Sequence, residues 1–149
     1  MQLLSIVAII SCLVSILSAY AVDMWLPERI TIIGSFFGLQ RSMNEGIAFG
    51  LHLGPYQDGI ILLAVLIIII IAFRSAVRIT ERIGFGLILG GGIANILDRL
   101  IDGTVTDMIQ VGTFPIFNVA DICINIGVAL ILVEMVLMWL SRQKTQQSK

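Results

Sequence analysis

Charged residues are scarce in this sequence. Asp, Glu, Lys and Arg make up only 13% of its 149 residues, whereas a soluble domain is usually about 25% charged. Hydrophobic residues make up 58%, and the mean hydropathy is +1.02. The net charge of -1 offers no basic surface for nucleic acid. The composition therefore predicts one domain, embedded in a membrane.

Metal-binding and disulfide-forming residues are also few. His52 is the only histidine, and Cys12 and Cys123 are the only cysteines. A catalytic zinc site usually takes several nitrogen or sulfur ligands, and two cysteines in apolar runs cannot form a disulfide framework. We expect no metal and no cofactor, and we interpret both cysteines as apolar filler.

Long apolar runs are abundant by contrast. A membrane-spanning helix needs about 20 apolar residues, and four segments approach this length. They predict spans at about 3–22, 57–74, 83–101 and 117–140 of a single domain, 1–149. The third span holds five glycines, which predict a close helix-packing face.

Positively charged residues indicate how the chain crosses the membrane, because Lys and Arg gather in cytoplasmic loops. Two groups stand out, one between the second and third spans and one after the fourth: Arg74, Arg78 and Arg82, then Arg142, Lys144 and Lys149. This pattern places both termini in the cytoplasm. The connections 23–58 and 101–116 then lie outside.

The first outer connection is long and has a β-like composition. Glu28–Met43 includes the run Ile30–Ile33 and the pair Phe36–Phe37, broken by Gly34 and Gly38. The predicted fold is therefore an all-α membrane protein with four transmembrane helices and a small extracytoplasmic β-like cradle. Its apolar side chains favour contact with lipid or a lipid-bearing ligand. An ordered lid without a ligand is the alternative.

Polar residues inside the last two spans are unusual, because ionisable groups in a membrane are costly and usually functional. They form one stripe on each helix near the outer end: Asn95, Asp98, Arg99 and Asp102 on the third, and Asn118, Asp121 and Asn125 on the fourth. Glu134 falls on another face, nearer the inner end, and we leave it out of the site.

Two aspartates are the candidate working groups. Asp107 follows the third span, and the Phe114-Pro115 break forces the chain to turn before Asp121. Two carboxyls at a poorly hydrated site share one proton, so one can act as a base while the other polarises a carbonyl. A structural Asp98–Arg99 pair or a proton relay would give the same composition.

Four segments resemble motifs of one family: Asn44–Gly50, Gly91–Leu100, Gly103–Asp107 and Phe114–Ile124. They are similar, in order, to Asn-x-Gly-Ala-Ala-Phe-Gly, Gly-Gly-x-x-Asn-x-x-Asp-Arg, Gly-x-Val-x-Asp-Phe and Phe-Pro-x-Phe-Asn-x-Ala-Asp-x-x-Ile of bacterial lipoprotein signal peptidase (signal peptidase II). The sequence departs from these motifs at Ile47, Ala94 and Met108. It also lacks the usual Gln and Lys after Asp23.

The resemblance implies an aspartyl endopeptidase of the bacterial plasma membrane, with its active site at the extracytoplasmic face. Such an enzyme removes the signal peptide of a prolipoprotein just before a diacylglyceryl-modified cysteine. Its partners are then these substrates and membrane lipid, and no obligate protein partner is evident. The resemblance makes Asp107 and Asp121 the catalytic pair. It implies supporting roles for Asp23, Asn44, Gly46, Asn95, Asp98, Arg99, Asn118 and Ala120.

Two other functions remain open from the residues. One is a small proton-coupled transporter or channel in which Asp98, Asp107 and Asp121 relay protons. The absence of an internal repeat argues against it. The other is a non-catalytic membrane assembly factor, which would tolerate the loss of Asp107.

Overall fold

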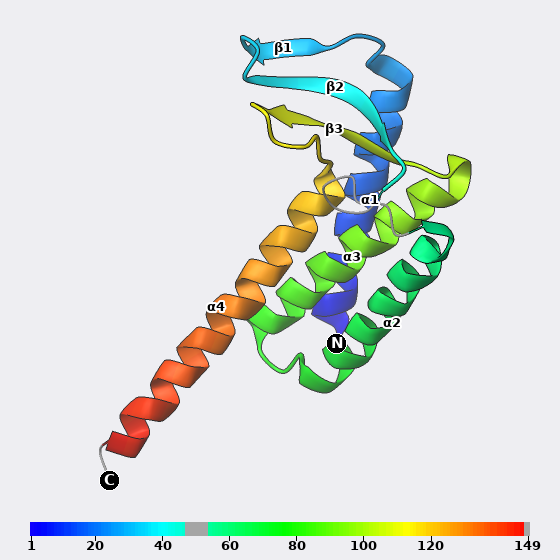
Figure 1. Ribbon diagram of the computed structural model, residues 1–149. Helices are drawn as coiled ribbons and strands as arrows, with labels where there is room; N and C mark the ends of the chain where they lie inside the picture. The colour runs from blue at the N-terminus through cyan, green and yellow to red at the C-terminus, as the bar shows by residue number, and fades with distance from the viewer. Residues whose placement is uncertain (47–53, 148–149) are drawn as a thin grey trace.

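Four long helices and a three-stranded sheet make up the computed structural model, which describes residues 1–46 and 54–147 (Figure 1). The helices are α1 Gln2–Trp25, α2 Gln57–Ser75, α3 Ile79–Asp102 and α4 Val119–Gln147, with a short 3-10 turn η2 at Gly54–Tyr56. All four helices are long and apolar enough to cross a membrane. Ile47 and His52 lie outside the described residues.

Helix α3 lies at the centre, in contact with α1, α2 and α4 (Figure 1). Its glycines allow these contacts. A Cβ on Gly90 would lie 2.4 Å from the Ala8 carbonyl oxygen of α1, and one on Gly91 would lie 2.5 Å from the Ala120 carbonyl oxygen of α4. Helices in lipid associate through such close packing. The predicted glycine packing face is therefore confirmed.

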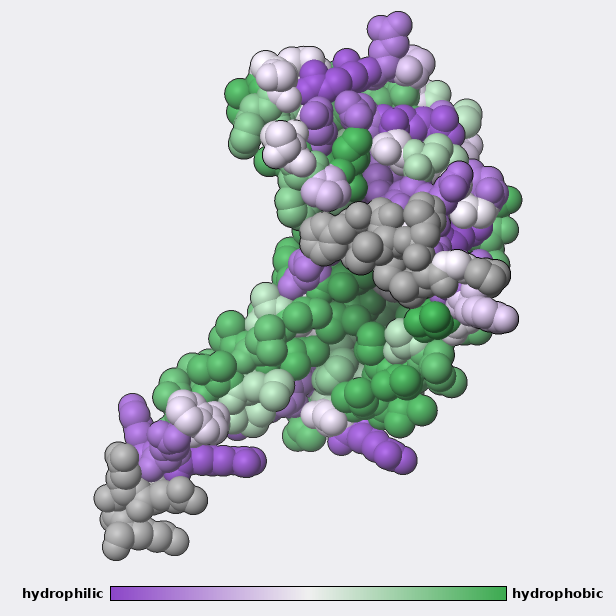
Figure 2. Space-filling model, in the orientation of Figure 1, coloured by the Kyte–Doolittle hydropathy of each residue, from purple (hydrophilic) through white to green (hydrophobic). Residues whose placement is uncertain are grey.

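The outer faces of the helices are apolar and exposed. In α2 only Gln57 and Ala72 are buried, and Figure 2 shows hydrophobic side chains over the middle of the molecule, with hydrophilic ones at its two ends. Lipid tails solvate apolar side chains as well as a protein core does, so a membrane helix needs no polar face. This surface confirms the expectation of a membrane protein.

The sheet has the order β1-β2-β3 and is antiparallel throughout. Strands β1 (Ile30–Ile33) and β2 (Phe37–Asn44) form a hairpin inside the segment predicted to be β-like, with Gly34 at a φ of +49° in the turn. Strand β3 (Val105–Val111) was not predicted. The expected loop 101–116 instead pairs with β2, and Ser42 lies opposite Asp107.

The end of the molecule opposite the sheet holds the N-terminus, the α2–α3 connection and the C-terminal end of α4 (Figure 1). An ion pair between Arg78, the residue before α3, and the buried Glu134 of α4 joins the two helices there. The prediction that Glu134 lies apart from the candidate site is confirmed.

Candidate active site

Asp107 reaches the site because α3 ends cleanly and β3 follows at once. Gly103, with a φ of +87°, terminates α3, and β3 begins at Val105. Asp107 is only 3% exposed. Its Oδ2 accepts a hydrogen bond from Asn44 Nδ2 at 2.8 Å, and its Oδ1 accepts one from Asn118 Nδ2 at 2.9 Å. The position of Asp107 on β3 and the hydrogen bonds from two amide side chains therefore fix this carboxylate.

Asp121 lies in the first turn of α4. The Asn118 side-chain oxygen accepts the backbone N–H of Asp121 at 2.9 Å, and Asp121 Oδ2 accepts the backbone N–H of Asn118 at 3.2 Å. This reciprocal cap satisfies two backbone donors at the start of the helix. A carboxylate there is also favoured by the helix dipole.

Two amide side chains connect the aspartates. Asn118 Nδ2, already bonded to Asp107, also donates to Asn95 Oδ1 at 3.1 Å. Asn95 Nδ2 then donates to Asp121 Oδ1 at 3.1 Å. The turn at Phe114-Pro115 therefore brings β3 and α4 close enough for one hydrogen-bond chain to run between both carboxylates.

The environment of Asp107 favours its protonated form. Burial raises the pKa of Asp107 to about 6, and the negative charges of Asp121 and Asp98 act in the same direction. Hydrogen bonds from Asn44 and Asn118 oppose this rise in pKa by stabilising the carboxylate. The result is a carboxyl that exchanges its proton nearer neutral pH than an ordinary aspartate does.

Arg99 is linked to Asn44 through hydrogen bonds to Gly46. Its Nη2 donates to the Gly46 carbonyl at 2.5 Å, and the Gly46 N–H donates to Asn44 Oδ1 at 2.9 Å. The expected alternative, a structural pair with Asp98, is wrong, because Asp98 instead accepts the backbone N–H of Thr106 at 2.7 Å. The carboxylate nearest to Arg99 is that of Asp58, at 3.9 Å.

A cavity of about 690 Å³ contains this network. Seven of the predicted site residues line it: Asn44, Gly46, Asn95, Arg99, Asp107, Asn118 and Asp121. Its remaining walls are mainly apolar side chains of α2, α3 and α4. Within the described parts of the chain, no group of three or more His, Cys, Asp or Glu side chains could hold a metal ion.

Three predicted supporting residues lie outside this cavity. Ala120 is 2% exposed, and its carbonyl packs against Gly91. Asp23, near the end of α1, and Asp98, near the end of α3, lie behind β3. They contact Thr106, the residue before Asp107.

Thr106 borders the site and was not predicted from the sequence, whereas Met108 was noted there only as a departure from the family motif. Thr106 and Met108 alternate with Asp107 along β3 and are 2% and 5% exposed. Met108 packs with α1 residues rather than in the cavity. The β-branched residues Val105, Thr106, Ile109 and Val111 were the available signal for this strand.

Known proteins match the chain over most of its length. Residues 6–137 match the family model described as signal peptidase (SPase) II. The lipoprotein signal peptidase of Chlorobaculum parvum is 42% identical over 125 residues, which are 71% of this chain and 76% of the relative. That of Mesorhizobium japonicum is 30% identical over 142 residues, 83% of this chain and 84% of the relative.

A solved structure shares the fold. It is a bacterial membrane enzyme determined by the in meso method at 2.3 Å resolution, with a TM-score of 0.76 and 23% sequence identity. The match covers 88% of this chain and 85% of that one. None of these matches supports the transporter alternative. The extent of the family match and the identity to the relatives show that the chain belongs to the signal peptidase II family.

Proposed function

We propose that this peptidase is an aspartic endopeptidase and that Asp107 and Asp121 are its catalytic pair. The observation that carries the proposal is that both carboxylates line one cavity and are joined through Asn118 and Asn95. Two carboxyls coupled in this way share a proton, which is the state that aspartic catalysis requires.

In the proposed reaction, the ionised carboxylate takes a proton from a water molecule, and the water oxygen attacks the scissile carbonyl carbon. The other carboxyl gives its proton to the carbonyl oxygen, so a neutral gem-diol forms. Return of a proton to the peptide nitrogen then breaks the C–N bond and leaves a new carboxyl and a new amine. The amides of Asn44, Asn95 and Asn118 hold both carboxylates in place during these transfers.

The substrates are prolipoproteins, in agreement with the family and the relatives named above. We propose cleavage just before a diacylglyceryl-modified cysteine. The apolar cavity walls from α2 and α4 suit the side chains of a signal-peptide helix, and the polar groups lie where that helix would end. Arg99 lines the cavity and binds the Gly46 carbonyl, so it can order the polar end of the cavity where the substrate would lie.

The proposed location is the bacterial plasma membrane, with both termini in the cytoplasm and the active site at the extracytoplasmic face. Residues 1–149 then act as one membrane-embedded unit. The α2–α3 connection, with Arg78 in it and Arg74 and Arg82 on its two sides, lies at the end opposite the sheet, which supports this orientation. In the same arrangement the sheet is a cradle that touches lipid, as the exposed Ile32 and Phe36 suggest.

A gel-shift assay with a purified, diacylglyceryl-modified prolipoprotein tests the catalytic pair. We expect the wild type to release the signal peptide and Asp107→Asn and Asp121→Asn each to lose about a thousand-fold or more of the rate, because an amide cannot exchange the shared proton. The variants should still insert into the membrane.

Glu28→Gln is the matched control, because it neutralises an exposed carboxylate at the sheet end of the molecule, outside the cavity. We expect it to cleave normally. Normal turnover by either aspartate variant would refute the aspartic mechanism. Unchanged function in a complementation test with Asp107→Asn would favour a non-catalytic assembly factor.

A further inference from the structure

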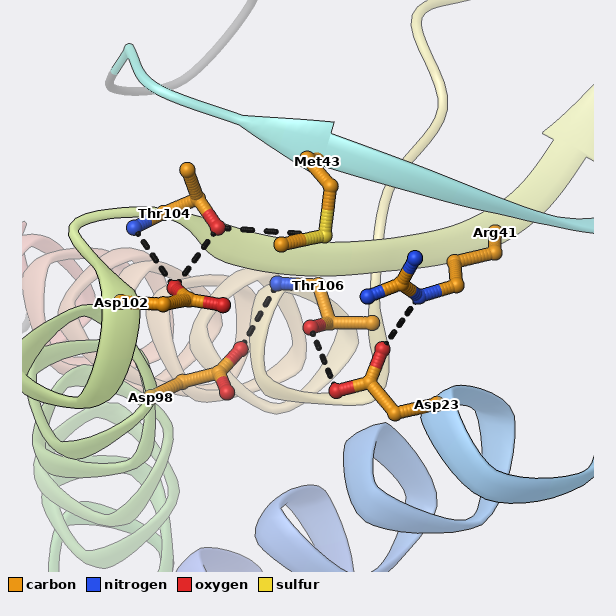
Figure 3. Close-up of polar contacts among 7 residues, drawn as sticks. All are labelled: Asp23, Arg41, Met43, Asp98, Asp102, Thr104 and Thr106. Carbon is orange, nitrogen blue, oxygen red and sulfur yellow. Dashed lines mark hydrogen bonds and ion pairs between the residues drawn. The ribbon is translucent and has the colours of Figure 1, made fainter.

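A row of polar side chains lies behind β3, on the face turned away from the cavity (Figure 3). Successive side chains of a strand point to opposite faces. Asp107 therefore faces the cavity, whereas Thr106 points toward the ends of α1 and α3. Thr106 is 2% exposed, so its polar atoms need partners within the protein.

Asp98 provides the first partner. Its Oδ2 accepts the backbone N–H of Thr106 at 2.7 Å, which ties β3 to the end of α3 one residue before Asp107. Asp102 fixes the intervening turn, since its Oδ1 accepts the Thr104 N–H at 3.0 Å and the Thr104 hydroxyl at 2.8 Å.

Asp23 provides the second partner and brings in a residue of β2. Thr106 Oγ1 donates to Asp23 Oδ2 at 3.4 Å, and Arg41 Nε donates to Asp23 Oδ1 at 2.5 Å. The backbone N–H of Thr106 is therefore bonded to α3, and its hydroxyl makes a longer contact with α1. Arg41 adds a link from one of those helices to the neighbouring strand.

Arg41 offsets part of the negative charge at this place. Asp23, Asp98 and Asp102 all lie near the C-terminal ends of helices, where the helix dipole disfavours negative charge. Among the described residues, Arg41 is the one base that forms an ion pair with any of these three. The hydrogen bond to Asp23 raises the pKa of Arg41 further.

We propose that Arg41 and Thr106 are positioning residues for the reaction: through Asp23 they hold β3 against α1, so that Asp107 keeps its place opposite Asp121. The inference rests on the proposed catalytic pair. Neither residue lines the cavity or contacts the reacting atoms. Their loss should therefore slow the chemical step and leave substrate binding intact, because small displacements of a catalytic group are costly in rate.

Steady-state cleavage of the diacylglyceryl-modified prolipoprotein by purified variants tests the proposal. For Arg41→Gln we expect kcat to fall by about two- to five-fold, the upper part of the range for loss of an exposed ion pair, with KM little changed. Arg41→Lys keeps the charge and should retain most of the wild-type kcat. Arg29→Gln is the matched control, since Arg29 bonds Gln110 at the far end of β3, and its kcat should be unchanged.

A second pair of variants separates hydrogen bonding from packing at Thr106. Thr106→Val keeps the shape and removes the hydroxyl, whereas Thr106→Ser keeps the hydroxyl and removes a methyl group. The positioning role requires Val to lower kcat more than Ser. The reverse order would show that Thr106 acts only by packing, and it would overturn the inference.

Parallel assays of Asp107→Asn keep the two proposals apart. An inactive Asp107→Asn beside a wild-type kcat for Arg41→Gln would overturn the positioning role and leave the catalytic pair standing. An equal loss of kcat in Arg29→Gln and Arg41→Gln would show that both substitutions merely weaken the sheet. That result would also overturn the positioning role of Arg41. Cleavage by Asp107→Asn would overturn both proposals.

Discussion

Asn44 has two separate hydrogen-bonding tasks at the edge of the site. Its Nδ2 stabilises the Asp107 carboxylate, and its Oδ1 accepts the Gly46 N–H, whose carbonyl in turn binds Arg99. The amide orientation is thus fixed by partners at both ends. Asn44 therefore tunes the acidity of Asp107 as well as its position.

The pH dependence of cleavage should reveal this tuning. The Asn44 donor favours the ionised form of Asp107, so Asn44→Ala should raise the Asp107 pKa above its value of about 6. One hydrogen bond corresponds to a shift of about half a unit to one unit. We expect the limb of the kcat–pH profile nearest pH 6 to move to higher pH by this amount.

Gln40→Ala, on the same strand and outside the cavity, serves as the control and should leave the pH profile unchanged. A limb that moves to lower pH in Asn44→Ala would contradict the assigned hydrogen bond. The limb belongs to the coupled pair, so its movement and not its absolute value is the diagnostic quantity.

Helix α3 holds the site together because it packs on α1 and α4 through glycine. Ala8 and Ser11 of α1 lie against Gly90, and the start of α4 lies against Gly91. The α4 contact involves Ala120, the residue next to Asp121. Helix packing therefore sets the distance between Asn95 on α3 and the carboxylate on α4.

A pair of glycine substitutions tests this packing. Gly90→Ala would put its Cβ 2.4 Å from a backbone oxygen, so we expect a loss of stability of about 1–3 kcal/mol, as for other overpacked cores. Gly59→Ala has no atom within 4 Å of its Cβ and should stabilise α2 by up to about 1 kcal/mol. Thermal unfolding in detergent measures both. Equal melting temperatures for the two variants would refute the close contact.

The whole molecule has a polar sheet end and an opposite end with the N-terminus, the α2–α3 connection and the C-terminal end of α4 (Figure 1). The two ends are separated by the lipid-facing apolar surface (Figure 2). The proposed orientation puts the sheet and Asp107 outside the cell, where the lipidated cysteine of a prolipoprotein would lie. It leaves Lys144 inside.

Labelling of single cysteines tests this orientation. In a background with Cys12→Ala and Cys123→Ala, a membrane-impermeant maleimide should label Ser35→Cys in intact spheroplasts. It should label Lys144→Cys only after permeabilisation, because charged reagents do not cross the bilayer. Both positions are exposed. The opposite labelling pattern would invert the proposed topology and place the site in the cytoplasm.

The sequence by itself determined the four helices and the β-hairpin. The length of the apolar runs, the placement of glycines and the β-branched runs are local features. A bilayer stabilises a long apolar helix whatever its distant residues are. The sequence also singled out Asp107 and Asp121, because carboxylates in or near apolar spans are conspicuous. The Phe114-Pro115 break indicated that the chain turns between them.

Only the tertiary structure decided how these carboxylates are held. Pairing of β2 with β3 joins residues more than sixty positions apart, and this pairing brings Asn44 to Asp107. It also placed Thr106 and Arg41 behind the site. Asp98 and Arg99 bond different partners, Thr106 and Gly46, rather than each other. Strand pairing and side-chain partners depend on which surfaces meet in space, and they cannot be predicted from the periodicity of the sequence.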